Sequence, residues 1–117
     1  MRLVRIALAT IDTTVGAVRS NVDRAVGAAH AAAKDGATIV VLPEQVVGGY
    51  MQEDLVQWRA FVAAQRRALE RFARETEDVG AACVLGVTVA RGSHLYSCAA
   101  MVHAGKVRGL WRGAADR

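Results

Sequence analysis

Two spacings of apolar residues alternate along this chain of 117 residues and predict its secondary structure. Short runs rich in valine and isoleucine are typical of buried strands, whereas apolar residues three or four positions apart are typical of amphipathic helices. Strands are expected at residues 3–9, 37–42, 82–90, 94–103 and 106–111, and helices at 21–34 and 56–77. The pattern therefore predicts an α/β fold with the order β-α-β-α-β-β-β.

Glycines mark the ends of several of these elements. Gly36 is expected to stop the first helix, because glycine readily adopts the left-handed conformation that follows many helices. Glycine-containing turns at 91–93 and 104–105 are expected to join the last three strands as hairpins. The apolar stripe on the second helix is interpreted as core rather than as a cofactor site. It consists of Trp58, Phe61, Val62, Leu69, Phe72 and Ala73.

A glutamate that follows the second strand is the main candidate for chemistry. Pro43 cannot continue a central strand, so Glu44 is expected just past the carboxyl end of that strand. Ligand sites of α/β sheets commonly lie at this edge, where a carboxylate among apolar neighbours can act as a general base. The alternative is a solvated loop glutamate that merely follows a strand. Tyr50 comes after two glycines, and its ring is expected to help wall a pocket at this edge.

Composition and charge narrow the possible classes of protein. The chain is long enough for one domain and contains no linker, repeat or low-complexity segment. No apolar run is long enough to span a bilayer and no signal peptide is evident, so a cytoplasmic location without a membrane partner is expected. The net charge is +4. Because arginines and glutamates alternate on the second helix as on a solvated face, nucleic-acid binding is not expected.

The other reactive residues give little sign of a second site. Cys83 lies in an apolar run and is expected to be a buried, inert thiol. Cys98 is expected in the middle of a strand, away from any nucleophile turn. Both cysteines fit free thiols in a reducing compartment. The histidines lack metal-ligand spacing, and the sequence contains neither GxxxxGK[ST] nor GxGxxG, so no metal or cofactor is expected.

Several segments together resemble the amino-terminal part of the nitrilase superfamily, the carbon–nitrogen hydrolases. They occur in the family's order at residues 3–9, 14–16, 36–44, 49–55, 95–100 and 105–112. Within the superfamily, the chain is similar in particular to the glutaminase domain of glutamine-dependent NAD synthetase. That likeness lies in residues 14–16, Asn21, residues 49–50 and 53–55, and the helix of residues 61–76. Stand-alone amidases and nitrilases share much of the same pattern.

The resemblance implies hydrolysis of an amide or nitrile by a glutamate, a lysine and a cysteine. In the family, the cysteine attacks the carbon, the glutamate takes the thiol proton, and the lysine helps to hold the tetrahedral intermediate. Glu44 matches the glutamate. The lysine follows an aromatic residue and an arginine, matched here by Trp111 and Arg112, but the next residue is Gly113. The nucleophile is expected beyond Arg117, so one of the three catalytic groups is present.

The resemblance also implies an incomplete fold. The family's α-β-β-α sandwich needs more than twice this length, so residues 1–117 are interpreted as the amino-terminal portion of one nitrilase-like domain. Uncovered apolar surface is expected to favour a homo-oligomer or a partner chain. Two functions stay open. The chain is part of a hydrolase of small-molecule amides, with glutamine as one candidate, active only when completed, or it is a non-catalytic fragment or interaction subunit.

Overall fold

The computed structural model describes residues 4–9, 18–42, 55–91 and 94–112. Its elements follow the expected order β-α-β-α-β-β-β, which confirms the predicted α/β class. They are β1 (Ile6–Leu8), α1 (Val18–Lys34), β2 (Ile39–Val41), α2 (Leu55–Glu75), β3 (Ala82–Arg91), β4 (His94–His103) and β5 (Lys106–Arg112). No helix within these ranges is long and apolar enough to cross a membrane.

Strand β4 has its predicted bounds, and the bounds of the other elements differ from the predicted ones by one to three residues. Helix α1 begins at Val18 rather than at 21. Strand β2 begins at Ile39 rather than at 37, because the N–H groups of Thr38 and Ile39 both donate to the carbonyl of Arg5 before the regular ladder starts. Helix α2 ends at Glu75 rather than at 77. There the chain tightens into a last turn closed by bonds between residues three positions apart.

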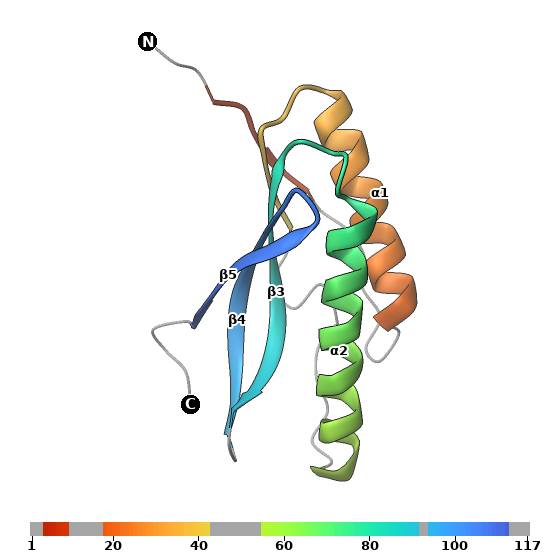
Figure 1. Cartoon of the computed structure of the whole chain (residues 1–117), viewed down its shortest axis with the longest axis vertical. Helices are drawn as coiled ribbons and strands as arrows, with labels where there is room; N and C mark the ends of the chain where they lie inside the picture. The colour runs from red at the N-terminus through yellow and green to blue at the C-terminus, as the bar shows by residue number, and fades with distance from the viewer. Residues whose placement is uncertain (1–3, 10–17, 43–54, 92–93, 113–117) are drawn as a thin grey trace.

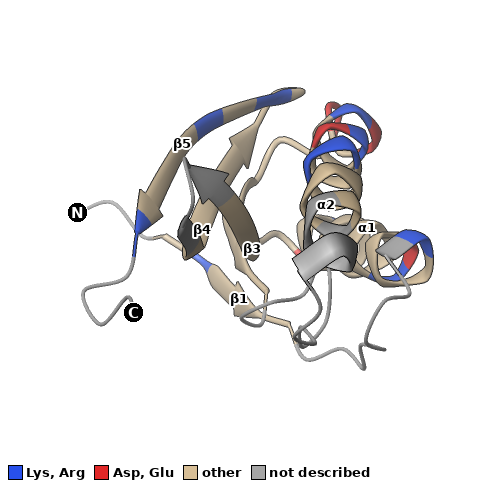
Figure 2. Cartoon of the chain, turned by 90° about the horizontal axis from the view of Figure 1, so that it is seen from below, with Lys and Arg blue, Asp and Glu red and all other residues tan. Residues whose placement is uncertain are grey.

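The five described strands form one mixed sheet with the order β1-β2-β3-β4-β5. Strands β1, β2 and β3 run parallel, whereas β4 pairs antiparallel with both β3 and β5. Strand β5 therefore runs in the same direction as β2 and β3. Helices α1 and α2 lie side by side on one face of this sheet, as Figure 1 and Figure 2 show. The carboxyl ends of β2, β3 and β5 consequently point toward the same end of the molecule.

The core lies between the two helices and the covered face of the sheet. Phe72 of α2 is fully buried and packs in one cluster with Leu69 and Ala73, as the apolar stripe predicts. Val62 is half-buried, and the side chains of Trp58 and Phe61 lie outside the described part of the structure. The sheet contributes alternate residues of β3 and β4, since side chains of a strand alternate between faces. These are Cys83, Leu85, Val87, Ala100 and Val102.

The opposite face of the sheet exposes apolar side chains. Ala7 pairs with the fully buried Val40, so its neighbours Ile6 and Leu8 point away from the helices. Leu8 is 78% exposed. At the other end of the sheet, Trp111 is 55% exposed. This face is therefore apolar at both edges of the sheet and is not covered by any described element.

The turn between β4 and β5 is the two-residue hairpin that the sequence predicts. Ala104 and Gly105 have φ angles of 54° and 84°, so both occupy the left-handed region. Two successive residues of this kind are characteristic of the turn whose twist matches that of paired antiparallel strands. A side chain at Gly105 would also lie within 3.1 Å of Glu77. Glycine is therefore favoured there by backbone conformation, and a larger residue would also require the Glu77 side chain to move by a few tenths of an ångström.

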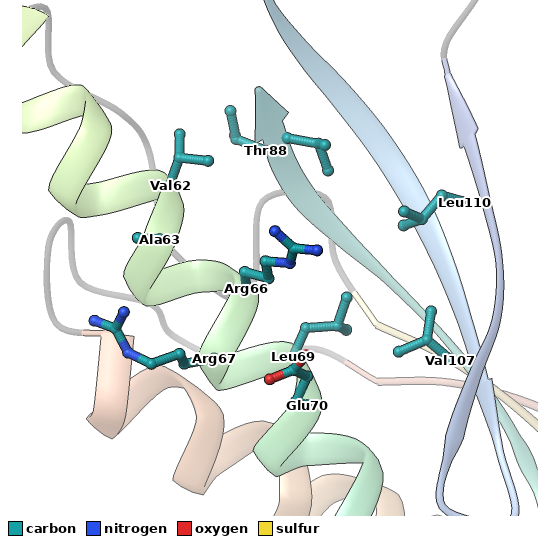
Figure 3. A pocket seen from close by; sticks show the side chains of 10 residues that line it. Val62, Ala63, Arg66, Arg67, Leu69, Glu70, Thr88, Val107 and Leu110 are labelled. Carbon is teal, nitrogen blue, oxygen red and sulfur yellow. The ribbon is translucent and has the colours of Figure 1, made fainter. Parts of the chain in front are cut away.

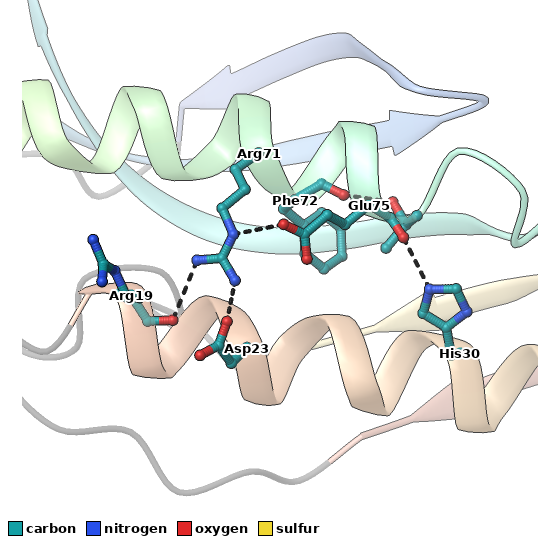
Figure 4. A network of polar contacts seen from close by, with 7 residues as sticks. Arg19, Asp23, His30, Arg71, Phe72 and Glu75 are labelled. Atoms are coloured by element: carbon teal, nitrogen blue, oxygen red, sulfur yellow. Dashed lines mark hydrogen bonds and ion pairs between the residues drawn. The ribbon is translucent and has the colours of Figure 1, made fainter.

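Arg71 of α2 joins the two helices. Its guanidinium forms an ion pair with Asp23 of α1 and donates through Nε to Glu75 at 2.8 Å, as Figure 4 shows. These contacts, first that with Glu75 and then that with Asp23, raise the pKa of Arg71. On the same side, Nε2 of His30 lies 2.9 Å from the carbonyl oxygen of Glu75. The prediction of a solvated charged face holds for neighbouring arginines, but Arg71 is half-buried and structural.

Candidate functional site

The register of the sheet determines which residues share a level at its carboxyl edge. Val41 of β2 pairs with Val84 of β3. Three residues further along β3, Val87 pairs with Cys98 of β4, and Cys98 pairs with Arg112 of β5. The described end of β2, at the level of Val84, therefore lies three residues before the level that Val87, Cys98 and Arg112 share. Strands β2 and β5 are three strand spacings apart in the sheet, or about 14 Å.

The residues of the sequence-predicted site follow β2 and β5 in the sequence. Glu44, Tyr50 and Gly113 themselves lie outside the described residues. The strands that lead to Glu44 and to Gly113 are described, and they run in the same direction and end at neighbouring levels. A glutamate after β2 and a group after β5 would therefore face one shared edge. Such an edge is where α/β sheets commonly bind ligands.

The guanidinium of Arg112 lies over an aromatic ring at this edge. Its Cζ atom is 4.9 Å from the centroid of the Tyr96 ring on β4. A cation in this position is attracted by the ring face, which restricts the arginine side chain. Arg112 is the arginine of the pair that precedes position 113 in the sequence. The last residue of β5 before that position is therefore held by β4.

Gln65 of α2 is a polar residue at this edge that sequence reasoning missed. It is fully buried, and its Oε1 accepts a hydrogen bond of 3.0 Å from the N–H of Thr88 on β3. Its Nε2 is buried without a hydrogen-bond partner among the described residues. The sequence did contain a sign of this role. Gln65 stands between Val62 and Leu69 on the apolar stripe of an amphipathic helix, where a polar residue is unusual.

Neither cysteine is placed as a nucleophile. Cys83 is 1% exposed, and burial raises the pKa of its thiol to about 11, so the reactive thiolate is disfavoured. Cys98 lies in the middle of β4, as predicted, and its sulfur is 3.9 Å from the carbonyl oxygen of Tyr96. The two cysteines are free thiols. The prediction that Cys83 is buried is confirmed.

A cavity of about 800 Å³ opens between α2 and the last strands. Figure 3 shows Val62, Arg66 and Leu69 on the helix side and Val107 and Leu110 on the sheet side. Its described lining is mainly apolar and includes neither a cysteine nor a histidine. No group of three or more histidine, cysteine, aspartate or glutamate residues within the described ranges is arranged to hold a metal ion. The described residues of this cavity thus supply no nucleophile and no metal site.

The sequence of this sheet and its two covering helices can be compared with known protein families. The family model described as "Carbon-nitrogen hydrolase" matches residues 5–112, so the chain belongs to the carbon–nitrogen hydrolase family. This match spans every described strand and both helices. The resemblance to the nitrilase superfamily is confirmed.

Particular relatives refine this assignment. The glutamine-dependent NAD(+) synthetase of Thermotoga maritima is 30% identical over 96% of this chain and 19% of its own length. The crystal structure of the corresponding synthetase from Cytophaga hutchinsonii has a TM-score of 0.82 and 24% identity, over 92% of this chain and 18% of that one, and shows the shared fold. An amidase from Nesterenkonia sp. has a TM-score of 0.75 and 26% identity, over 93% of this chain and 42% of that one. The chain thus spans about a fifth of the matched synthetases' length.

The burial of Cys83 predicts a loss of stability at high pH. Its folded pKa of about 11 exceeds the usual 9.0. The stabilising contribution is therefore complete below pH 9 and is lost as the pH rises through 11, by about 2 to 3 kcal/mol. Urea unfolding at several pH values measures this loss. The Cys83→Ala variant should lose less stability between pH 9 and 11 than the parent chain, and an identical loss in both would contradict the prediction.

Proposed function

We propose that this chain is the amino-terminal portion of a single amide-hydrolysing domain in which Glu44 is the general base. The observation that carries the proposal is that β2 and β5 run in the same direction in one sheet, since this directs the chain after each strand toward one edge. Membership of the carbon–nitrogen hydrolase family supports the reaction class. The likeness to synthetases named for their dependence on glutamine supports glutamine as the amide.

The proposed chemistry divides the reaction among a glutamate base, a cysteine nucleophile and a lysine that helps to hold the tetrahedral intermediate. The Glu44 carboxylate takes the proton of a cysteine thiol, and the thiolate sulfur forms a bond to the amide carbon. When the carbon–nitrogen bond breaks, that proton passes from Glu44 to the departing amine, and ammonia leaves. Water then cleaves the thioester and frees the acid and the thiol. Of these groups, this chain supplies the base, and Tyr50 is proposed to help wall the substrate pocket.

A second candidate function is a non-catalytic fragment or interaction subunit. Gly113 favours it, because a glycine stands where the family's lysine follows the aromatic–arginine pair. Without a cation at that position, the negative charge of the tetrahedral intermediate loses one of its stabilising partners. In this case, Glu44 would be a retained residue without a reaction to serve.

The isolated chain of 117 residues is expected to release no ammonia from glutamine above the uncatalysed background. The reason is that Gly113 replaces the lysine and that neither Cys83 nor Cys98 is placed as a nucleophile. Loss of members of a catalytic unit costs several orders of magnitude in turnover. A coupled ammonia assay on the purified chain measures this. Turnover that Cys98→Ala abolishes would contradict the prediction.

Glu44 can be tested in a completed domain. In a chimera, residues 1–112 replace the matching segment of the Thermotoga maritima synthetase, which supplies the rest of the domain. We expect this chimera to hydrolyse glutamine and Glu44→Gln to lower kcat about 10³-fold, because an amide cannot accept the thiol proton. Glu53→Gln is the matched control, a glutamate of the same stretch without an assigned role. Near-normal turnover in Glu44→Gln would refute the base assignment.

The exposed face of the sheet is proposed to be covered by a second copy or by a partner chain. Ile6, Leu8 and Trp111 expose apolar surface at both of its edges. Surfaces of this kind mark association sites, and obligate interfaces resemble a domain core cut in half.

In analytical ultracentrifugation, the purified chain is therefore expected to sediment as an oligomer. Leu8→Lys should shift it toward a smaller species, because a charge cannot be buried there without a partner. Arg67→Ala, on the helix side of the molecule, is the control and should leave the distribution unchanged. A monomer that unfolds cooperatively at all concentrations would contradict the proposed association.

A further inference from the structure

Strand β5 carries apolar side chains on the core face of the sheet that are only partly covered. Val107 pairs with Val102, and Leu110 pairs with Ala100, and both partners are buried in the core cluster. Residues that pair directly across antiparallel strands share a face, so Val107 and Leu110 belong to the face that the helices cover. Leu110 is nevertheless 48% exposed. The described residues therefore leave the core open on the β5 side.

Helix α2 supplies the opposite wall of this opening. Val62 and Leu69 stand on its apolar stripe, and together with Val89 of β3 they line the cavity of about 800 Å³. Ligand pockets in proteins commonly measure about 300 to 1,000 Å³ and are mainly apolar with a few polar groups. Water finds few hydrogen-bond partners between such walls. The cavity therefore suits a molecule with an apolar body.

One cation reaches into this cavity. Figure 3 shows the guanidinium of Arg66 directed from α2 toward the strands, whereas that of Arg67 is directed away from them. Among the described residues no carboxylate pairs with Arg66, although Glu70 lines the same cavity one helical turn further on. Arg71, by contrast, forms ion pairs with two carboxylates. Arg66 is exposed, so its charge is accessible to a ligand.

A carboxylate with an apolar body matches both features of the cavity. A guanidinium can donate two parallel N–H bonds to the two oxygens of a carboxylate. A hydrocarbon body gains free energy when the apolar walls remove it from water. A sugar or a polyphosphate is a poorer match, because a mainly apolar lining leaves several of its polar groups without partners.

We propose that the cavity between α2 and β5 binds a small carboxylate with an apolar body, and that the charged head of this ligand pairs with Arg66. Val62, Leu69 and Leu110 cover the hydrocarbon part. The proposal uses only described residues and does not rest on Glu44. Its failure would leave the proposed hydrolase function untouched, because the ammonia assay and the chimera test that function separately.

The test titrates octanoate, below its micelle concentration, into the full chain of 117 residues in a calorimeter. We expect saturable binding that tightens about threefold to fourfold for each methylene between hexanoate and octanoate. Octanol is the uncharged probe of the same length and should bind about threefold to fivefold more weakly, because it loses the ion pair. Adsorption to a purely apolar surface would give the opposite order, since burial of a charge is costly there.

Variants separate the two contributions to binding. Arg66→Gln should abolish the preference for octanoate over octanol, and Arg66→Lys should restore part of it because the positive charge returns. Arg74→Gln removes the same charge from α2 at an exposed position outside the cavity lining, so it is the matched control and should change neither affinity. Leu110→Ala should weaken both probes by a similar factor of about threefold, because it removes apolar wall and no charge.

A second apolar surface could bind the same probes, namely the exposed sheet face that carries Leu8. Leu8→Lys should leave octanoate binding unchanged, and loss of binding in this variant would place the probe on that face and refute the proposal. Absence of saturable binding, or an unchanged octanoate preference in Arg66→Gln, would refute it too. If octanoate affinity falls as the chain concentration rises, a second copy covers the cavity and the proposal is wrong.

Discussion

The parallel register of β2 against β3 is the constraint on which the rest of the molecule depends. It is fixed by few hydrogen bonds, among them those from Ala82 to Thr38 and from Leu42 to Val84. A shift by one residue would turn Val40 out of the core and bring its neighbours in, at the cost of a fully buried apolar side chain. The same register decides where the chain after Leu42 emerges. A single alignment of two strands therefore sets both the core and the point at which the chain leaves β2.

The local pattern of the sequence was sufficient to predict the helices and strands and their order along the chain. Strands, helices and the turn at Ala104 and Gly105 follow from side-chain periodicity and from glycine, both of which act over a few residues. Element ends were less predictable, because tertiary hydrogen bonds decide them. The start of β2 depends on the carbonyl of Arg5, which lies far away in the sequence. Local reasoning has no access to such a partner.

The candidate site was less predictable from the sequence than the secondary structure was. Pro43 and the family pattern single out Glu44 from sequence, but the common direction of β2 and β5 follows only from the pairing of four strands. Gln65 was missed because a glutamine on an amphipathic stripe looks like an ordinary interruption. Its meaning comes from Thr88, which is 23 residues away in the chain. Similarly, the sequence does not distinguish Arg71 from the solvated arginines of the same helix. Its partner Asp23 lies on α1 and is brought close only by the packing of α1 on α2.

The tight turn at Ala104 and Gly105 has a consequence for how the chain folds. Strands β3, β4 and β5 are neighbours in both sequence and space, so their pairing closes only short loops, whereas β1, β2 and β3 meet only after two helical crossovers. Short loop closures are fast, and contacts distant in sequence slow the search for the native state. The antiparallel meander should therefore form first and serve as the template on which β2 docks. The edge that carries the candidate site would then be among the last parts of the molecule to be completed.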